Sequence, residues 1–435
     1  FKMNLVRASR LLAVQNKPAS SKSVGLKLLL GNAFIHPAGR GLFSLLSLGQ
    51  RVVDKLVRII DAELEALGAQ KVAVPALGGK EVWEKSGRWD SMGAELLKIK
   101  DRLGKELCLQ PTAEEIMTEI VAHHSKLPFS TFPLLLYQTT EKFRDEMNPR
   151  FGLVRGKQFI MNDMYSFDLT KEGSSKTYEE VCSTYDRIFR EKLGLEVYKV
   201  AADGSAHGGR ISHEYHMLNA LEEDALLRCN SCGTFYKADE KSEVCCEGAK
   251  NSRISSIEVA HTFELGDKCS VPYGLVYGKN SLPLQMCCFG IGVTRLLPAI
   301  IEFLARGECV DEPILRLPVS IQPFDVSVVV TKSLGSSSVL SEILSALSTL
   351  FSGQRATILL DDRYEWTIRR RVKYAEQIGL STVIVLGRQT EKTADSGPLY
   401  ELWSSAPLEG VPLSKKGDFD CSELLNLVRK ERHLC

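Results

Sequence analysis

The sequence lacks several features that mark common protein classes. No apolar run reaches the roughly 18 residues that a bilayer-spanning helix needs, so we expect no membrane association. The 12 cysteines follow no disulfide-framework spacing, and no secretory signal with an apolar centre is present, which favours reduced thiols in an intracellular compartment. Internal repeats are also missing. Because the net charge is only +1, any nucleic acid must be bound through local basic patches.

Acidic residues are absent from the start of the chain. Basic residues, among them Lys2, Arg7 and Arg10, precede the first acid, Asp54. A basic, serine-containing and acid-free start is typical of an organelle-targeting segment, and a solvated basic arm that contacts RNA is the alternative. We therefore expect residues 1–20 to be a basic arm or a targeting remnant.

The periodicity of apolar residues divides the chain into two parts. In the first part it predicts helices over 51–67, 177–193 and 295–305 and strands over 71–74, 134–138 and 159–161. Prolines at 313, 318 and 323 mark a linker. Beyond them, the pattern predicts strands over 325–330 and 382–386 and helices over 339–351 and 368–378, as in a compact α/β unit with a parallel sheet.

Two predicted strands carry an unusual group of charged and aromatic residues. Arg144 has a planar guanidinium that can bind a carboxylate and a phosphate oxygen together. Glu146 lies on the same face of the strand, and Arg155 and Phe159 return on the next strand. Phe159 can stack on a purine ring while Arg155 reaches outer phosphates. A surface ladder of ion pairs is the alternative interpretation.

Three further segments offer polar side chains to a ligand. Arg295 follows Gly290 and Gly292 in the first turn of a helix, where a cation opposes the helix dipole, so we expect an anion such as a phosphate nearby; a solvent-facing arginine in a tight turn is the alternative. Thr112 and Glu114 could bind an ammonium group or begin a helix, with Thr112 as its cap. Segments 212–215 and 258–261 are either a polar pocket wall or partly buried strands.

Taken in order, these segments resemble prolyl-tRNA synthetases of the bacterial and organellar type, which are class II aminoacyl-tRNA synthetases. The resemblance runs from about Ser21 to the C-terminus and rests on Ser86–Trp89, Pro111–Glu115, Lys142–Glu146, Asp163–Phe167, Ser212–Glu214, Gly290–Arg295 and Asp361–Arg363. It implies an α+β catalytic domain with an antiparallel sheet, the class II synthetase fold, over 21–318. It also implies a C-terminal α/β anticodon-binding domain over 322–435.

The same resemblance implies where the class motifs lie. Motif 1 falls at about 51–75, motif 2 at about 134–161 and motif 3 at about 286–305. Full-length bacterial relatives carry a large editing insertion after the segment matching 212–215. Here a short cysteine-containing loop, 229–256, takes its place, so we expect that hydrolysis of alanyl-tRNA is absent.

The implied activity is ATP-dependent attachment of proline to tRNA(Pro) through a prolyl-adenylate, with Mg²⁺, in a homodimer of the mitochondrial matrix. A cytoplasmic location is the alternative. Two other functions remain open at this point: a class II synthetase for another amino acid such as threonine, and a non-catalytic RNA-binding paralogue. Fixed cations and Mg²⁺ can stabilise the charge of both reaction steps, so the chemistry requires no side-chain nucleophile.

The resemblance also implies roles for individual residues. Arg144 would hold the α-phosphate and the proline carboxylate, and Arg295 would hold the γ-phosphate. The remaining ATP contacts would be Glu146, Arg155, Phe159 and Glu258. Proline would be bound by Thr112, Glu114, Arg144, His261 and Cys288. In the C-terminal domain, the expected tRNA contacts are Arg363, Arg369, Arg370 and Lys373.

Metal binding is left open by the cysteines of the 229–256 loop. Cys229 and Cys232 have the spacing of metal ligands, but Cys245 and Cys246 are adjacent instead of forming a second C-x-x-C. No metal is assigned from the sequence, and small reduced cysteines are the favoured interpretation.

Overall fold

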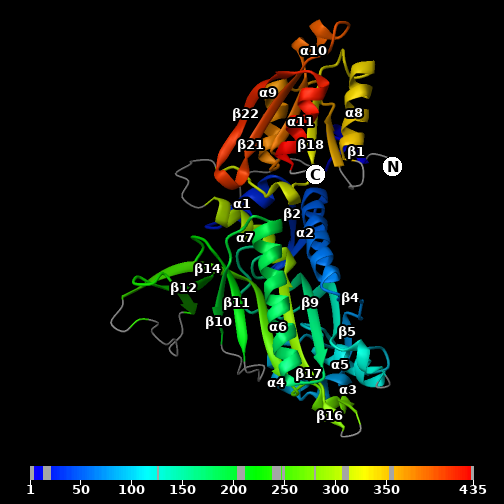
Figure 1. Cartoon of the computed structure of the whole chain (residues 1–435), viewed down its shortest axis with the longest axis vertical. Helices are drawn as coiled ribbons and strands as arrows, with labels where there is room; N and C mark the ends of the chain where they lie inside the picture. Colours follow the sequence, from blue (N-terminus) through cyan, green and yellow to red (C-terminus); the bar gives the residue numbers. More distant parts are fainter. Residues whose placement is uncertain are drawn as a thin grey trace. The chain divides into compact units, whose positions relative to one another are not determined.

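The computed structural model describes residues 4–12, 21–124, 127–202, 211–237, 246, 250–278, 281–305, 313–351 and 357–432. The chain forms two compact units (Figure 1). The large unit consists of Pro37–Phe43 and Leu56–Phe303. The small unit consists of Phe1–His36, Ser44–Lys55 and Leu304–Cys435. Among the described residues, no helix combines the length and apolar character that a bilayer span requires.

A nine-stranded sheet organises the large unit. Its main path runs β10-β11-β14-β17-β9-β8-β4, and β12 and β13 extend it beside β14. Described pairs are antiparallel except β4 with β8. The bounds are β4 Gln70–Lys71, β8 Leu134–Phe143, β9 Gln158–Asp168, β10 Tyr198–Ala201, β11 Ser212–Leu218, β12 Asp224–Cys229, β13 Phe235–Lys237, β14 Asn251–Gly266 and β17 Gln285–Gly292. The expected antiparallel sheet is confirmed.

The helices predicted around this sheet are present with shifted ends. Helix α2 spans Ser47–Ala66, α6 spans Lys171–Asp186 and continues as a π-helical segment over Arg187–Lys192, and α7 spans Val293–Leu304. Gly68 follows α2 with a φ of 92°, the left-handed conformation expected of a residue after a helix end. Strand β4 is shorter than the predicted 71–74, although the Val72 amide still donates to the Tyr137 carbonyl at 2.8 Å.

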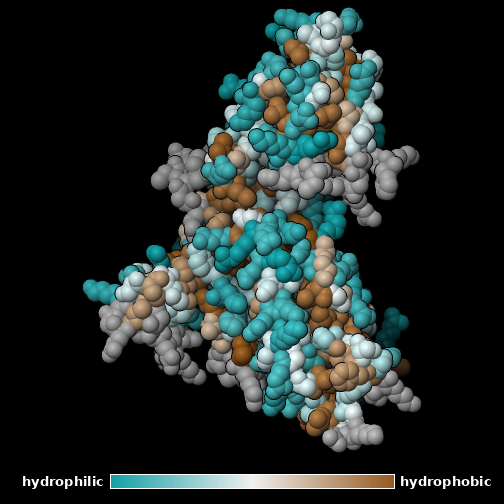
Figure 2. Space-filling view, viewed as in Figure 1, coloured by the Kyte–Doolittle hydropathy of each residue, from teal (hydrophilic) through white to brown (hydrophobic). Residues whose placement is uncertain are grey.

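Strand alternation gives the two faces of the sheet different environments. Successive side chains of a strand point to opposite faces. Helix α6 lies across one face (Figure 1), where Tyr178 packs on Phe289 and Ser174 contacts Cys287. The outward side of α6 gives a hydrophilic surface (Figure 2). Cys288, Gly290 and the odd-numbered residues of β9 between Phe159 and Tyr165 line a cavity of the large unit instead.

Smaller elements complete the two units. A three-stranded sheet has the order β5-β7-β6, and β15 pairs with β16 and β2 with β3. Their bounds, with those of the short helices, are α1 Val24–Gly31, β2 Ile35–Gly39, β3 Leu42–Leu45, β5 Leu77–Gly79, α3 Lys80–Lys85, α4 Arg88–Ser91, β6 Lys98–Lys100, β7 Glu106–Leu109, α5 Glu114–His123, β15 Val276–Tyr277 and β16 Leu282–Pro283.

The small unit contains the predicted parallel α/β core. Its sheet has the order β1-β19-β18-β20-β21-β22, with β18 parallel to both β19 and β20. The two last strands are antiparallel additions that periodicity did not predict. The bounds are β1 Asn4–Arg7, β18 Val326–Val330, α8 Ser338–Leu350, β19 Thr357–Asp361, α9 Ile368–Gln377, β20 Thr382–Leu386, α10 Arg388–Thr393, β21 Tyr400–Ala406, β22 Val411–Phe419 and α11 Cys421–Glu431.

The start of the chain differs from the expected free arm. Residues Asn4–Arg7 form β1, which pairs in parallel with β19. Arg7 then pairs with Asp362 at 3.2 Å, and the Ser9 amide donates to the same carboxylate at 3.0 Å. Backbone pairing thus ties this segment to a sheet edge. Residues 13–20 of the expected arm lie outside the described residues.

The division between the units also differs from the predicted boundary at the proline linker. Residues 21–36 and 44–55, expected in the catalytic domain, cluster with the small unit. A buried charge group connects segment 44–55 to the rest of the small unit. Asp325 accepts from Lys55 at 2.8 Å and from Arg432 at 2.5 Å, and the Arg51 guanidinium lies 4.7 Å from the centre of the Phe324 ring.

Candidate active site

A cavity of about 490 Å³ in the large unit collects the residues that sequence reasoning singled out. Its wall contains nearly all of the predicted ATP and proline contacts: Thr112, Glu114, Arg144, Arg155, Phe159, Glu258, His261, Cys288 and Arg295. Glu146 is not in the wall but pairs with Arg155 at 3.2 Å. Residues far apart in sequence therefore converge on one site. An ion-pair ladder at the surface accounts for Glu146 and Arg155 but not for this convergence.

Arg144 faces the cavity with little compensation of its charge. Its backbone amide donates to the Lys157 carbonyl at 2.9 Å, and its guanidinium lies 5.3 Å from the centre of the Phe159 ring. The carboxylate of Glu95 is 3.8 Å away. Desolvation lowers the pKa of Arg144, the negative charge of Glu95 opposes this shift in part, and the positive charge of Arg295 lowers the pKa further. A guanidinium stays charged under these conditions, so both cations favour an anion in the cavity.

Arg295 is positioned by neutral acceptors. Its Nε donates to the Val154 carbonyl at 2.8 Å, and its Nη1 donates to the Glu258 carbonyl at 3.1 Å. Carbonyl oxygens orient the guanidinium without neutralising it. The alternative of a solvent-facing arginine in a tight turn is therefore wrong, because Arg295 is partly buried and lines the same cavity as Arg144.

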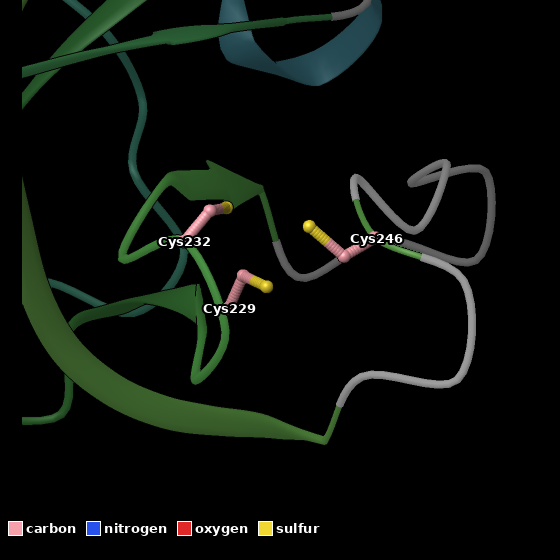
Figure 3. A group of neighbouring side chains, drawn as sticks. All are labelled: Cys229, Cys232 and Cys246. Carbon is pink, nitrogen blue, oxygen red and sulfur yellow. The ribbon is translucent and has the colours of Figure 1, made fainter.

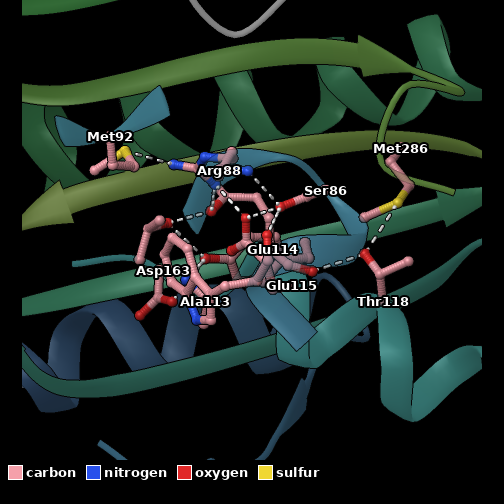
Figure 4. Close-up of polar contacts among 12 residues, drawn as sticks. Ser86, Arg88, Met92, Ala113, Glu114, Glu115, Thr118, Asp163 and Met286 are labelled. Atoms are coloured by element: carbon pink, nitrogen blue, oxygen red, sulfur yellow. Dashed lines mark hydrogen bonds and ion pairs between the residues drawn. The ribbon is translucent and has the colours of Figure 1, made fainter. Parts of the chain in front are cut away.

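A hydroxyl and a carboxylate, from Thr112 and Glu114, also line the cavity, and Figure 4 shows Glu114 beside Arg88. The Thr112 hydroxyl donates to Glu114 at 2.5 Å, and Arg88 pairs with Glu114 and with Glu115 at 3.0 Å each. Helix α5 begins after Ala113 without any side-chain cap, so the alternative role of Thr112 as a helix cap is wrong. Glu114 is buried and ion-paired, and its negative charge faces the cavity.

Glu115 lies behind this wall and differs from Glu114. It is 1% exposed, and it accepts from Ser86 at 3.0 Å in addition to Arg88. Desolvation raises the pKa of Glu115 to about 7, although the charge of Arg88 opposes the shift. The two neighbouring carboxylates therefore share one guanidinium, and Glu115 is the one that gains a proton near neutral pH.

A polar chain that includes the cavity-lining residues Asp163 and Tyr165 was not assigned a role from the sequence. The Tyr165 hydroxyl donates to Asp163 at 2.9 Å, accepts from the Ala113 amide at 2.9 Å and lies 3.2 Å from the Thr112 hydroxyl. Asp163 is paired with the buried Lys142 at 2.8 Å. Asp163 and Tyr165 lie in the segment Asp163–Phe167, which carried the family resemblance, and this resemblance was the signal in the sequence that could have identified them. The chain fixes the position of Thr112 through its neighbours.

A second acidic wall faces the cavity from β11 and β14. His261 lies between the Ser212 hydroxyl, 2.7 Å from Nε2, and Glu258, 2.9 Å from Nδ1. Desolvation alone would raise the pKa of Glu258, but the hydrogen bond and charge of His261, together with Arg295, lower it to about 2. Glu214 pairs with Lys237 at 2.5 Å. Sequence reasoning missed the roles of Glu214 and Lys237, although Glu214 lies in a matched segment.

The Cys288 thiol completes the wall near Glu114 as a neutral group. Desolvation raises the pKa of Cys288 well above its usual value, and the charge of Glu114 acts in the same direction. A buried neutral thiol behaves as a small apolar side chain. This end of the cavity is thus small and partly apolar, with a single hydroxyl–carboxylate pair beside it.

The predicted tRNA contacts lie in the small unit and are not equivalent. Arg363 forms two hydrogen bonds with Asp361, at 3.0 and 2.5 Å, and its guanidinium lies 4.1 Å from the Trp366 ring and 4.0 Å from the Tyr374 ring. It is 8% exposed, so its assignment as a phosphate contact is corrected: it stabilises the turn before α9.

The other three basic residues remain candidates. Arg369, Arg370 and Lys373 are exposed on α9, with the Arg370 guanidinium 3.9 Å from the Trp366 ring. Exposed cations on one helix can meet phosphates.

Known proteins resemble this chain in both sequence and fold. The family model of the tRNA synthetase class II core domain (G, H, P, S and T) matches residues 97–303. The chain is 38% identical to a probable mitochondrial proline–tRNA ligase of Rattus norvegicus over 96% of this chain and 88% of that protein. It is also 38% identical to the corresponding protein of Homo sapiens, over 97% and 89%.

A bacterial relative extends the comparison. The proline–tRNA ligase of Sulfurimonas denitrificans is 32% identical over 98% of this chain and its whole length. Among solved structures, a prolyl-tRNA synthetase from Cryptosporidium parvum complexed with halofuginone and AMPPNP superimposes with a TM-score of 0.74, over 96% of this chain and 77% of the other, at 15% identity. That likeness confirms the class II fold. By its sequence relatives, this chain belongs to the proline–tRNA ligase family of class II tRNA synthetases.

Proposed function

We propose that this protein attaches proline to tRNA(Pro) at the expense of ATP, through a prolyl-adenylate. The observation that carries the proposal is the convergence of Arg144 and Arg295 on one cavity that Thr112 and Glu114 also line. Two cations suit a triphosphate, and a hydroxyl–carboxylate pair suits the imino group of proline. Relatives named as proline–tRNA ligases over nearly the whole chain support the substrate.

In the first step, a carboxylate oxygen of proline attacks the α-phosphorus of ATP. A new O–P bond forms, the bond to the bridging oxygen breaks, and pyrophosphate leaves. Arg144 holds the attacking carboxylate and the α-phosphate together, which converts a bimolecular encounter into an oriented reaction. Phe159 stacks on adenine, and Arg295 holds the γ-phosphate so that charge on the leaving group is stabilised.

In the second step, the 3′-terminal hydroxyl of tRNA attacks the activated carbonyl, an ester forms, and AMP leaves with the electron pair of the broken bond. Thr112 and Glu114 keep the imino group in place during both steps. Glu114 is held by Arg88 and the Thr112 hydroxyl, so its carboxylate is oriented before the substrate arrives. No described side chain needs to form a covalent bond with the substrate.

Mg²⁺ fits the acidic wall of the cavity. Ligand atoms of Glu214, Glu258 and His261 lie within 4.8 Å of one another, and the low pKa of Glu258 keeps this carboxylate ionised. Carboxylates combined with nucleotide phosphates are the usual Mg²⁺ ligands. When bound, the ion would be held by Glu214 and Glu258 and would neutralise phosphate charge.

Proline-dependent exchange of labelled pyrophosphate into ATP tests the proposal. We expect exchange with proline and none with threonine, and aminoacylation of tRNA(Pro) by the same preparation. Exchange driven by another amino acid, or no exchange with any, would contradict the assignment. The second result is what a non-catalytic RNA-binding paralogue would give.

Arg144→Ala supplies the matched mutational test. It should abolish exchange while the fold is retained, because the interaction lost is one with the reacting groups. Activity within about tenfold of the unmodified protein, roughly 1.4 kcal/mol of barrier, would show that Arg144 does not hold them.

The cellular setting and the assembly are part of the proposal. The mammalian relatives named as mitochondrial support a mitochondrial location, and we place the enzyme in the matrix. We further propose that the protein is a homodimer assembled through α2 and β4. We propose that its catalytic domain, which lacks the large editing insertion, does not hydrolyse alanyl-tRNA(Pro). We also propose that Arg369, Arg370 and Lys373 contact tRNA. Fluorescent tagging tests the mitochondrial location, and the mass of the purified protein in solution tests the homodimer. The rate at which the protein hydrolyses alanyl-tRNA(Pro) tests the absence of editing, and rapid hydrolysis would contradict it.

A further inference from the structure

Three cysteines meet at one point beside the β12–β13 hairpin (Figure 3). Cys229 is the last residue of β12 and Cys232 lies in the turn that follows, while Cys246 comes from another part of the chain. Their Sγ atoms all lie within 4.8 Å of one another. The expectation from sequence was a set of unconnected reduced thiols, because Cys245 and Cys246 do not form a second C-x-x-C. Because the three described thiols converge, the lack of a second C-x-x-C no longer argues against a metal site.

The turn between the two strands presents Cys229 and Cys232 on the same side. The Gly233 amide donates to the Cys229 carbonyl at 2.9 Å, and the Cys229 amide donates to the Thr234 carbonyl at 2.9 Å. Gly233 has a φ of 77°, which lets the chain reverse over this short distance. The Thr234 hydroxyl lies 3.2 Å from the Cys232 sulfur, where it can donate to a thiolate. The backbone thus prearranges two sulfurs before the third arrives.

The sulfur positions match the requirement of a tetrahedral metal centre. A Zn–S bond of about 2.3 Å places the sulfurs of a tetrahedral site about 3.8 Å apart, and the three Sγ atoms, all within 4.8 Å of one another, are close enough to share one ion. Thiolate ligands select Zn²⁺ over the hard cations that nucleotides carry. We propose that Cys229, Cys232 and Cys246 bind one structural Zn²⁺ and supply three of its four ligands.

A metal at this position has a structural consequence for the active site. The hydrophobic cluster under the hairpin is small; its buried members are Val200, Leu218 and Leu226. Strand β13 ends at Lys237, whose ammonium group pairs with Glu214 in the wall of the catalytic cavity. A metal that fixes the turn between β12 and β13 therefore holds Lys237 against Glu214. An effect of the metal on catalysis through Lys237 rests on the proposed function, whereas the metal site itself does not.

Metal content of the full chain tests the proposal directly. The protein is purified without chelator or an affinity metal, and its zinc is measured by plasma mass spectrometry alongside the thiol count. We expect about one zinc per chain, and single Cys→Ser variants at 229, 232 and 246 should each lose more than about 100-fold in Zn²⁺ affinity, beyond the roughly 10- to 100-fold effect of losing an indirect partner. Cys421→Ser, at the start of α11 in the small unit, is the matched control and should keep the metal.

Cobalt substitution provides a readout that does not depend on activity or on the stability of a variant. Co²⁺ bound by thiolates should give sulfur-to-metal charge-transfer absorption and the visible bands of a tetrahedral site. A chain with fully reduced thiols that holds no zinc and gives no cobalt spectrum overturns the proposal, as does a disulfide between Cys229 and Cys232 in protein purified under reducing conditions.

The active-site consequence has its own test. Removing the metal with a chelator should lower kcat/KM for proline-dependent exchange several-fold, and Zn²⁺ should restore it. Lys237→Met in the zinc-loaded protein should reproduce the loss while zinc content stays unchanged. Loss of zinc with unchanged kinetics would contradict the coupling through Lys237 but not the metal site. Absence of exchange in the zinc-loaded protein would contradict the proposed function alone.

Discussion

Replacing Tyr165 with phenylalanine removes one hydroxyl group from the polar chain behind the proposed proline pocket. That hydroxyl donates to Asp163, accepts from the Ala113 amide and contacts the Thr112 hydroxyl. The ring itself is 1% exposed and would keep its packing, since phenylalanine has the same shape. The substitution therefore separates the hydrogen bonds of Tyr165 from its contribution to the core.

The expected magnitude follows from what each partner retains. Asp163 loses the hydrogen bond from Tyr165 but still accepts from Lys142 at 2.8 Å and from Gln138 at 3.0 Å. The Ala113 amide is left without the acceptor described for it, and an unsatisfied buried donor costs about 1–3 kcal/mol. We expect the free energy of unfolding to fall by about 2 kcal/mol. Because Ala113 connects Thr112 to Glu114, we expect KM for proline to rise about tenfold, which corresponds to about 1.4 kcal/mol.

The assay is proline-dependent pyrophosphate exchange, with KM measured separately for proline and for ATP. KM for ATP should stay within about twofold, because Tyr165 has no described contact with Arg144, Arg295 or Phe159. Tyr178→Phe is the matched control. Its hydroxyl is also buried, with Thr262 at 2.6 Å and His213 at 2.8 Å, but it lies on the α6 side of the sheet. It should lose stability without a change in KM for proline. An equal rise in both variants, or none in Tyr165→Phe, would refute the reasoning.

Three further predictions concern charge. The pKa of Glu115 is raised to about 7 from 4.5, so this carboxyl contributes stability that is fully present below about pH 4.5 and is lost as pH rises through 7. In urea unfolding, the free energy of unfolding of Glu115→Gln should therefore rise relative to the unmodified protein by up to about 3 kcal/mol between about pH 5 and pH 8. Glu179→Gln, at an exposed position, should show no such rise. Asp325→Asn should destabilise the small unit by about 3–5 kcal/mol in urea unfolding, since it leaves two cations buried without their carboxylate; a loss below about 1 kcal/mol would contradict this. Replacing both Arg369 and Lys373 with alanine should raise KM for tRNA and flatten its salt dependence while pyrophosphate exchange is unchanged, and an unchanged KM for tRNA would remove α9 from the tRNA contacts.

The fold was predictable where periodicity and local chemistry agree. The helix over Ser47–Ala66 has a regular apolar stripe and a glycine after its end, and the strands around β18 and β20 are continuous apolar runs. Strands β21 and β22 were missed because neither is a continuous apolar run: β21 alternates buried and half-buried residues with several polar side chains, and β22 is largely exposed. The pairing of Asn4–Arg7 with β19 could not be predicted, since a short strand at a sheet edge depends on a partner far along the chain.

The site was predictable in its ligand contacts but not in what supports them. Arg144 and Arg295 stand out because each breaks a local preference for its position, and ordered motifs then assign them to one nucleotide. Arg88 and Tyr165 carry no such signal. Arg88 becomes informative only when the fold brings it between Glu114 and Glu115, and Tyr165 only when its hydroxyl meets the Ala113 amide. Arg363 shows the opposite error, because a basic residue in a matched motif is held internally by Asp361.

The most direct test of the central claim is a crystal structure of the protein with proline and a non-hydrolysable ATP analogue. Arg144 should donate to the α-phosphate and the proline carboxylate, and Arg295 should donate to the γ-phosphate of the same nucleotide. A nucleotide bound with either guanidinium beyond hydrogen-bond distance of its phosphates, or bound outside this cavity, would contradict the account.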